Sequence, residues 1–553
     1  MKINWKWRPS KQRIVGWVLA LFTVLLVTTN QQDIGIARDE TVYFGAGTRY
    51  AEWWLGLVTF KHGIAKKSIT DTFGGAPGGG TNSEHPPLIK TAMGLSHWLL
   101  YDKLHVTDEL TAYRFPGALF AGLLVLLVYS MTLALWGFPE AVIAALCTLL
   151  LPRALFHAGL ACFDAPIMTL WFATIYAYWR CLDERKWPWQ VGVVFGLALA
   201  TKHNAVLLPF ALGLHYVVIA WRAGKWRGLV YHKPRVVLSL ALLGPLTLIV
   251  LWPWLWFDTF AHIKQWLSFH TSHVHYNFEY LGTNWNAPRF PWHVALVTTL
   301  FTVPVATLAA ACAGAGVLVV RWRRRENADH ERAPALLLAL SAAASIGPFF
   351  LGSTPIFGAE KHWMPALPTL CIAAGVGAAW AARQAAEYVR ALRPVGEVLA
   401  RRVALGIVGG AIVLACATET VAAQPYALTW YNALAGEAPG GADLGMNRQF
   451  WGVAARGVLP FIANQFPTRV YSHDASPAWG WYHRLGLLRG FPDAGQEGVG
   501  VERSNLALVI HEKHFNRHDY MIWKSYGTVR PVFVLRSEGV PIVTVYKRPV
   551  PRP

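Results

Sequence analysis

Charged residues are scarce in this chain, and their scarcity decides its broad class. Only 15% of the 553 residues are charged and 54% are hydrophobic, whereas soluble domains carry about 25% charged residues. The composition therefore predicts a polytopic α-helical membrane protein. Acidic residues are fewer than basic ones, 31 against 50. The excess positive charge lies in short clusters between apolar runs, as in cytoplasmic loops, so we expect no nucleic-acid partner.

Two further features are lacking: cysteines in the hydrophilic segments, and internal repeats. All six cysteines lie in or at the ends of apolar runs and none in the long hydrophilic segments, so no disulfide framework is predicted. The chain has no internal repeat, whereas many secondary transporters are built from paired halves with charges near the membrane midplane. This absence disfavours a transporter without removing it as an alternative.

The apolar runs predict about eleven membrane-spanning helices. They lie at 14–30, 112–136, 140–159, 164–181, 188–203, 204–221, 235–256, 294–320, 333–352, 362–382 and 402–420. The run 88–101 is short and interrupted by Lys90 and His97, so we expect an interfacial or re-entrant helix there.

If the run 88–101 does not cross the membrane, the basic segments all fall on the same side of it. They are 1–13, 180–188, 221–235, 321–332 and 383–402. The positive-inside rule then predicts a multi-pass membrane protein with a cytoplasmic N-terminus. The C-terminus lies on the opposite, extracytoplasmic side.

Two domains are expected. Residues 1–420 form the transmembrane domain, with a first external loop at 31–111, and residues 421–553 form a small extracytoplasmic α/β domain. Strand-like runs recur in the second part, separated by glycine- and proline-rich turns. They are Arg469–Ser472, Leu506–His511, Pro531–Leu535 and Pro541–Tyr546.

An acidic pair, Asp39 and Glu40, follows directly on the first apolar run. Carboxylates at the mouth of a membrane helix are costly near lipid and therefore indicate function. One carboxylate can take the proton of an attacking hydroxyl or amine while its neighbour orients it or holds a cation. A helix cap, or a surface ion pair with Arg38, is the alternative.

A second polar cluster runs from Glu84 to Lys90 and contains two consecutive prolines. The prolines fix the backbone at the start of a short helix and so aim His85 and Lys90 from a defined geometry. Such groups suit a lipid-linked phosphate held at the interface. An interfacial helix anchored by Lys90 and His97 is the alternative.

Several further polar residues fall on the predicted external side. They are Asp164, Lys202, Glu360, Lys361 and His362. Each equally fits a helix end or an interfacial anchor, but their segregation to one side predicts a single site. The external loop 257–293 also carries His270, His273 and His275. With Glu84 these histidines are candidate ligands of a divalent metal ion; loop packing or headgroup contact is the alternative, and no cofactor is certain.

The ordered series of motifs resembles the protein O-mannosyltransferases and the aminoarabinose transferases, which are membrane glycosyltransferases of the GT-C type. The motifs are Asp39-Glu40, His85-Pro86-Pro87-Leu88-Ile89-Lys90, Cys162-Phe163-Asp164-Ala165-Pro166, Thr201-Lys202-His203-Asn204, Lys361-His362-Trp363-Met364-Pro365, Tyr431-Asn432 and Phe450-Trp451-Gly452. The chain departs from the aminoarabinose transferases at His85, where they have lysine, and at Val42, where they have arginine.

The resemblance implies an inverting glycosyltransferase with a polyprenyl-phosphate sugar as donor. It implies that Asp39 is the catalytic base supported by Glu40, and that His85 and Lys90 lie near the carrier phosphate. It also implies that Asp164 contacts the sugar or acceptor and that Lys202 and Lys361 neutralise phosphate. The acceptor stays open among a glycan, a lipid and a protein. A multi-spanning transporter and a non-catalytic envelope protein that binds glycans are the alternatives.

Overall fold

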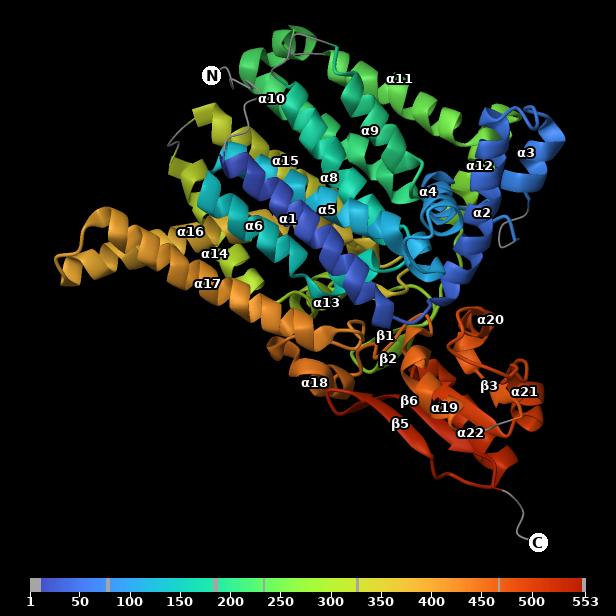
Figure 1. Cartoon of the computed structure of the whole chain (residues 1–553). Helices are drawn as coiled ribbons and strands as arrows, with labels where there is room; N and C mark the ends of the chain where they lie inside the picture. The colour runs from blue at the N-terminus through green and yellow to red at the C-terminus, as the bar shows by residue number, and fades with distance from the viewer. Residues whose placement is uncertain are drawn as a thin grey trace.

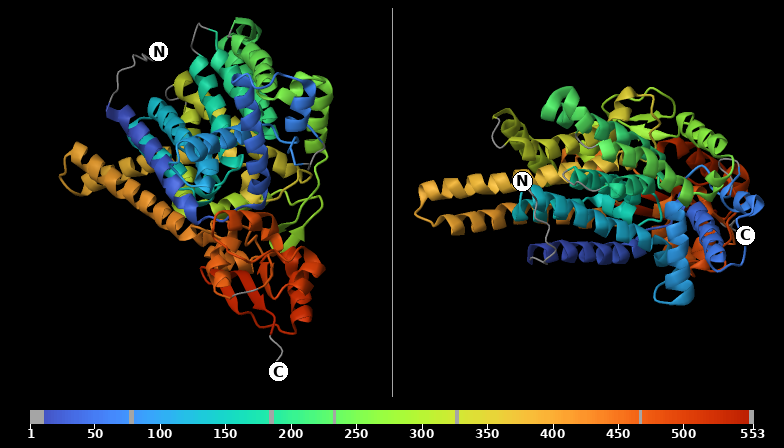
Figure 2. Two further views of the ribbon diagram at one scale, coloured as in Figure 1. Left: turned by 45° about the vertical axis from the view of Figure 1, so that its right-hand side comes forward. Right: turned by 90° about the horizontal axis from the view of Figure 1, so that it is seen from above.

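The computed structural model of the chain describes residues 11–75, 80–182, 187–231, 234–324, 328–465 and 468–549. Long helices form one bundle, and a small sheet with short helices lies at one end of it (Figure 1). The turned view on the left of Figure 2 shows the same arrangement. We call this end of the bundle the sheet end. The predicted fold class, a polytopic helical protein with a small C-terminal α/β unit, is confirmed.

Seven of the described helices are long and apolar enough to cross a membrane. They are α1 (Lys11–Asn30), α5 (Glu109–Leu135), α10 (Leu208–Tyr231), α14 (Val305–Arg324), α15 (Ala328–Ile346), α16 (Leu367–Leu392) and α17 (Glu397–Ala423). Helices α6 (Phe138–Leu149) and α7 (Pro152–Ala158) meet that criterion only as a pair bent by 66°. The run predicted as one span at 140–159 is thus broken, at a proline that cannot donate to the preceding turn.

The remaining predicted spans correspond to shorter helices. Helices α8 (Asp164–Cys181), α9 (Trp189–Leu199) and α11 (Pro234–Leu251) run beside α10 in Figure 1. The run 294–320 is divided between α13 (Val294–Thr302) and α14. Length and composition therefore support seven spans, or eight with the bent pair, where the apolar runs predict about eleven. Parts of the basic segments at 1–13, 180–188, 221–235 and 321–332 lie outside the described residues.

The segment predicted as the first external loop is largely helical. It contains α2 (Arg38–Val58), α3 (Lys66–Phe73) and α4 (Leu88–His97), and α4 continues as a π-helix at Trp98–Lys103. The short helix expected at 88–101 is confirmed. Helix α2 was not predicted because its charged residues interrupt the continuous apolar runs from which we predicted the spans.

Helices α2 and α4 cross at two glycines. A methyl group on Gly94 would collide with the carbonyl oxygen of Gly47, and one on Gly47 with the carbonyl oxygen of Lys90. Glycine is therefore required at both positions for the two backbones to touch. This close crossing fixes the start of α2 relative to the 82–90 segment.

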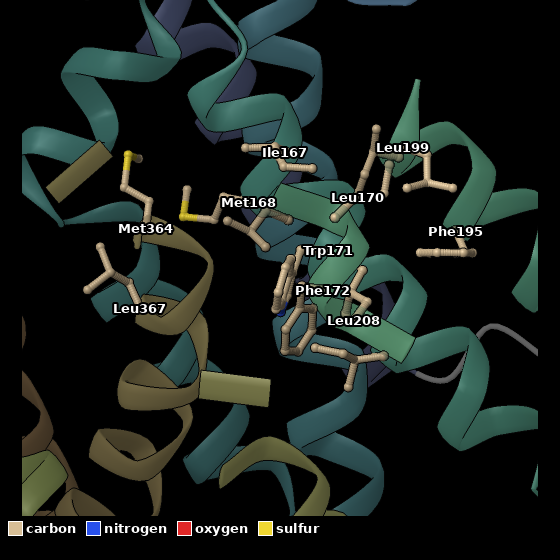
Figure 3. Packing of buried hydrophobic residues seen from close by; sticks show 14 of the residues in the cluster. Ile167, Met168, Leu170, Trp171, Phe172, Phe195, Leu199, Leu208, Met364 and Leu367 are labelled. Carbon is tan, nitrogen blue, oxygen red and sulfur yellow. The ribbon is translucent and has the colours of Figure 1, made fainter. Parts of the chain in front are cut away.

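The main hydrophobic core lies in the middle of the bundle. Figure 3 shows Trp171 and Phe172 of α8 packed among residues of α9, α10 and α16. The indole of Trp171 is fully buried, and its N–H donates to the Ser341 hydroxyl at 2.8 Å. Because α8 is held along its length, its first residue, Asp164, has a fixed position at the end of the helix.

The C-terminal unit contains a four-stranded sheet in the order β3-β4-β6-β5. Strands β3 (Val470–Tyr471) and β4 (Leu506–Ile510) are parallel, whereas β6 (Val540–Lys547) is antiparallel to both β4 and β5 (Phe533–Ser537). All four strand-like runs predicted from the sequence are confirmed. The accompanying helices are α18 (Glu437–Asp443), α19 (Leu459–Ala463), α20 (Ser476–Arg484), α21 (Glu497–Arg503) and α22 (Asn516–Tyr526).

The loop 257–293 lies against this C-terminal unit. It consists of α12 (Thr259–Thr271) and a hairpin of β1 (Phe278–Tyr280) and β2 (Thr283–Trp285). The N–H of Gly282 in the hairpin donates to the carbonyl of Gly445 at 3.1 Å. The sheet end is therefore covered by two segments far apart in the sequence.

Replacing Gly94 by alanine should separate α2 from α4. Alanine favours a helix by about 1 kcal/mol over glycine, but the new methyl group has no room here, and overpacking costs about 1–3 kcal/mol. We expect a lower midpoint of thermal unfolding for Gly94→Ala in detergent. Gly406→Ala in α17, where the added methyl group meets nothing within 4 Å, should keep or raise the midpoint; equal midpoints for the two variants would contradict the close crossing.

Candidate active site

The two carboxylates of the acidic pair have opposite environments. The Glu40 side chain is fully buried, whereas that of Asp39 is 35% exposed. Glu40 accepts four hydrogen bonds of 2.7–2.8 Å, from the N–H groups of Ala37 and Ala161 and from two nitrogens of Arg114. Asp39 is thus the member of the pair that can reach a substrate.

Arg114, in α5, is the partner that the sequence analysis missed. Its side chain is fully buried and also donates to the carbonyls of Gln31, Ile34 and Gly35. Arg114 and Glu40 neutralise each other, and together they fix the turn that leads into α2. The available signal was a lone arginine inside an apolar run, where an unpaired charge is not tolerated.

Lys90 forms its hydrogen bonds with the loop that precedes its own helix. Its side chain is fully buried, and the ammonium donates to the Asn82 carbonyl at 2.6 Å, to the Asn82 amide oxygen at 2.9 Å and to the His85 carbonyl at 2.9 Å. Lys90 therefore shapes the 82–85 segment, and its donors point at protein oxygens. The contact with the carrier phosphate that the resemblance implies for Lys90 stays a prediction.

His85 stands beside aromatic rings at the same place. Its ring centroid lies 5.3 Å from that of Phe163 and 5.7 Å from that of His270. Burial, helped by the charge of Lys90, holds the pKa of His85 well below its ordinary value. The ring is therefore a neutral hydrogen-bonding group at physiological pH, with a buried Nδ1 that has no partner among the described residues.

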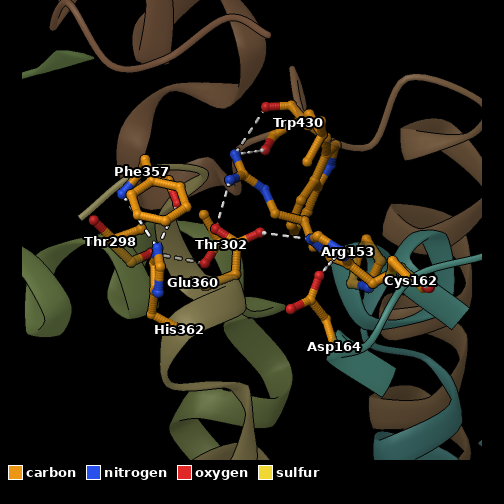
Figure 4. Close-up of polar contacts among 12 residues, drawn as sticks. Arg153, Cys162, Asp164, Thr298, Thr302, Phe357, Glu360, His362 and Trp430 are labelled. Atoms are coloured by element: carbon orange, nitrogen blue, oxygen red, sulfur yellow. Dashed lines mark hydrogen bonds and ion pairs between the residues drawn. The ribbon is translucent and has the colours of Figure 1, made fainter. Parts of the chain in front are cut away.

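Asp164 and Lys202 form an ion pair at the start of α8. The ammonium lies 2.7 Å from one carboxylate oxygen, and Nδ1 of His157 lies 3.5 Å from the other. Figure 4 shows the neighbouring ion pair of Arg153 with Glu360, at 2.8 Å; Arg153 also donates to the carbonyls of Leu428 and Trp430. The Arg153–Glu360 pair ties α7 to the segment just before α16.

The ammonium of Lys361 is buried and surrounded by three aromatic rings. It lies 4.1 Å from the ring centroid of Trp451, 4.5 Å from that of Phe450 and 4.7 Å from that of Phe357. Aromatic faces attract a desolvated cation. Among the described residues, no hydrogen bond or ion pair engages the ammonium with a carboxylate or carbonyl. Burial lowers the pKa of Lys361 to about 8, against the opposing charges of Asp164 and Asp39.

His362 bonds to the turn that precedes it. Its Nε2 lies 2.5 Å from the Phe357 carbonyl, and the ring packs edge-on against Phe357. His362 thus closes the 357–362 turn that presents Lys361. Asp39, Asp164 and Lys361 come together at the sheet end from α2, from α8 and from the 3₁₀ helix Ala359–His362.

The predicted metal ligands are not brought together. His270 pairs with the carbonyl of Glu84 and stacks on His203, whereas His273 stacks on Phe357 and His275 lies against Phe290. Within the described parts of the chain, the one group with ligand atoms close enough for an ion is His157, Cys162 and Asp164. Because Lys202 already neutralises Asp164 there, we assign no metal to this group.

The comparisons place the chain among known proteins. Residues 84–256 match the family model of dolichyl-phosphate-mannose-protein mannosyltransferase. The undecaprenyl phosphate-alpha-4-amino-4-deoxy-L-arabinose arabinosyl transferase 2 of Pseudomonas fluorescens is 30% identical over 203 residues. That match spans 35% of this chain and about a third (34%) of that relative.

The solved structures compare over nearly the whole chain. ArnT from Cupriavidus metallidurans in the apo state is 13% identical with a TM-score of 0.50, over 96% of this chain and 98% of that one. The Archaeoglobus fulgidus oligosaccharyltransferase in the apo form is 13% identical with a TM-score of 0.52, over 95% and 72%. The chain has the GT-C membrane fold. Together with the matches to the mannosyltransferase family model and the aminoarabinose transferase relative, this confirms the resemblance seen in the sequence motifs. The roles of Asp39, Asp164 and Lys361 stay predictions.

Removing Arg114 should unfold the start of α2. Arg114→Met leaves the Glu40 carboxylate buried and unpaired, which costs about 3–5 kcal/mol, so thermal unfolding in detergent should move to a clearly lower temperature. The double variant Glu40→Gln/Arg114→Met should recover part of this loss. Arg401→Met breaks the half-exposed Arg401–Glu397 pair, which is worth about 1 kcal/mol or less, and serves as the control; a similar loss in both single variants would contradict the assigned role of Arg114.

Proposed function

We propose that this chain is an inverting glycosyltransferase that moves a sugar from a polyprenyl-phosphate donor to an extracytoplasmic acceptor. One observation carries the proposal. An accessible carboxylate, Asp39, and a cation enclosed by aromatic rings, Lys361, lie at the same end of a GT-C bundle. The match to a mannosyltransferase family and the aminoarabinose transferase relative support a lipid-phosphate donor.

The reaction needs a base on one side of the sugar and a cation on the other. Asp39 takes the proton from the acceptor hydroxyl or amine as that group attacks the anomeric carbon. The bond between the anomeric carbon and the phosphate oxygen breaks, and the phosphate leaves with the electron pair. Lys361 stabilises the charge that develops on the phosphate, in surroundings where water cannot screen it.

The other polar residues serve this pair. Neutral His85 can donate a hydrogen bond to a phosphate or sugar oxygen, and Lys202 adds positive charge beside Asp164. Glu40 and Lys90 hold the backbone on which Asp39 and His85 stand. A metal ion has no assigned step in this scheme.

The proposed setting is the inner membrane of a bacterium, with a cytoplasmic N-terminus and the sheet end outside. The clusters of basic residues between apolar runs support this orientation. Residues 1–420 then form the membrane domain and residues 421–553 an extracytoplasmic domain beside the site. The donor enters from the outer leaflet, and the acceptor is a glycan, a lipid or a protein.

The first test is transfer of radiolabel from polyprenyl-phosphate sugars to bacterial lipids, glycans and proteins. Asp39→Asn should keep the fold and donor binding but reduce transfer by about 10²–10⁴-fold, the usual contribution of a general base. Asp33→Asn removes an exposed carboxylate six residues earlier in the chain and should leave transfer unchanged. Full activity of Asp39→Asn would contradict the mechanism, and no transfer by the unaltered protein would contradict the proposed function.

The pKa of Lys361 predicts how phosphate binding depends on pH. Its ammonium loses its proton as the pH rises through about 8, whereas a phosphate monoester is already ionised above its second pKa of about 6. The affinity for polyprenyl phosphate should therefore fall between about pH 7 and pH 9. Lys361→Arg keeps its charge throughout, so calorimetric titration should show a flatter profile; equal slopes for both proteins would remove Lys361 from phosphate binding.

A further inference from the structure

Arg38 lies between two carboxylates from different parts of the chain. Its guanidinium is 2.5 Å from a carboxylate oxygen of Asp474 in the C-terminal unit but 3.9 Å from the nearer oxygen of its neighbour Asp39. The first distance is a full ion pair, and the second is beyond hydrogen-bonding range. Arg38 is therefore committed to Asp474.

Asp474 is dedicated to this contact. Its side chain is 7% exposed, and Arg38 is its only hydrogen-bond donor among the described residues. The residue sits in the 3₁₀ turn His473–Ala475 directly after β3. His473 adopts a left-handed backbone conformation, with φ of 55°, and its Nδ1 accepts from the N–H of Ile510 in β4. The turn, and with it the carboxylate, is anchored to the sheet.

The backbone of Arg38 is fastened to the same unit. Its N–H donates to the carbonyl of Trp451 at 2.9 Å, and the N–H of Ile36 donates to the Tyr482 hydroxyl at 3.0 Å. Gly452, which follows Trp451, lies against the turn that carries Asp474, since a methyl group there would lie 3.0 Å from the Asp474 carbonyl. The start of α2 and the turn that carries Asp474 thus form one rigid assembly.

Five titratable groups surround Asp39 and Arg38. They are Tyr43 of α2, Lys361 before α16, Asp474 after β3, and Glu512 and His514 after β4. Burial, reinforced by Asp474 and Glu279, holds the pKa of Glu512 well above its ordinary value. The raised pKa favours the protonated form of Glu512 and weakens it as a partner of Arg38, so Asp474 and Asp39 are the carboxylates that compete for the guanidinium.

We propose, resting on the function proposed above, that Asp474 is a positioning residue that holds the guanidinium of Arg38 away from Asp39. An arginine paired directly with Asp39 would occupy its lone pairs and lower the proton affinity of a base that has to accept a proton. The C-terminal unit thereby keeps the catalytic carboxylate free. The same contact makes activity depend on the docking of this unit on α2.

The test is a double-mutant series with transfer assayed across pH. In Asp474→Asn the charge that holds Arg38 is lost, so Arg38 pairs with Asp39. We expect kcat/KM to fall by about tenfold or more, with the acid limb of the pH profile displaced to lower pH by about 1–3 units. In Arg38→Met/Asp474→Asn the competing guanidinium is gone, and the acid limb should return to that of Arg38→Met alone.

Two further variants keep the result interpretable. Glu512→Gln is built into a parallel series, because an ionised Glu512 could replace Asp474 as the partner of Arg38. Asp493→Asn is the matched control, since Asp493 accepts from Ser472 in the same unit but does not contact Arg38. An acid limb that stays in place in Asp474→Asn, or a double variant no more active than Asp474→Asn, would overturn the proposal and leave Asp474 a merely structural residue.

A second readout separates this proposal from the proposed function. Carbodiimide labelling of Asp39, quantified by mass spectrometry against pH, follows the protonated carboxyl group without any turnover. A labelling midpoint that moves to lower pH in Asp474→Asn and returns in the double variant supports the positioning role even if no sugar is transferred. An unmoved midpoint rejects it even in an active enzyme.

Discussion

The site depends on a charge pair buried without access to water. Isolated, Glu40 or Arg114 would be prohibitively costly in the interior of a membrane protein. Together they satisfy each other, and the remaining donors and acceptors are met by backbone groups of two segments, residues 31–37 and Ala161. This arrangement explains why the chain turns sharply between α1 and α2. It also explains why the two members of an acidic pair, adjacent in sequence, end in opposite surroundings.

The C-terminal unit belongs to the site and is more than an appendage of the bundle. Trp451 links the two, because its carbonyl accepts from the backbone of Arg38 while its ring covers the ammonium of Lys361. A single residue therefore contacts both the segment that carries the base and the cation opposite. Its backbone is left-handed, with φ of 70°, a conformation uncommon outside glycine and often found where function constrains the chain.

Much of this architecture follows from residue patterns alone. Apolar runs separated by basic clusters predicted a polytopic bundle, and strand-like runs between turns after position 421 predicted the strands that form one sheet. Asp39, Asp164 and Lys361 were expected to share a site because their positions fall on one side of the predicted membrane. Local patterns of this kind need no knowledge of packing.

The finer assignments required the packed structure. A sequence does not say which of Asp39 and Glu40 turns inward, since that choice depends on Arg114 from a distant helix. Lys90 and Lys361 look alike as isolated lysines, yet one is enclosed by carbonyl oxygens and the other by rings. Helix α2 was not predicted because its buried residues, among them Tyr43, Tyr50 and Trp53, alternate with charged ones and so form no continuous apolar run.

The aromatic cage around Lys361 has a consequence for turnover. Rings stabilise the ammonium without neutralising it, so an incoming phosphate need not displace a carboxylate first. The same unneutralised charge remains when the sugar has left, and the spent carrier then presents a phosphate monoester with more negative charge than the donor diester. In the proposed reaction, such a site would retain the lipid product more firmly than the donor. Departure of the carrier, and not cleavage of the glycosidic bond, would then be the step that the cage slows.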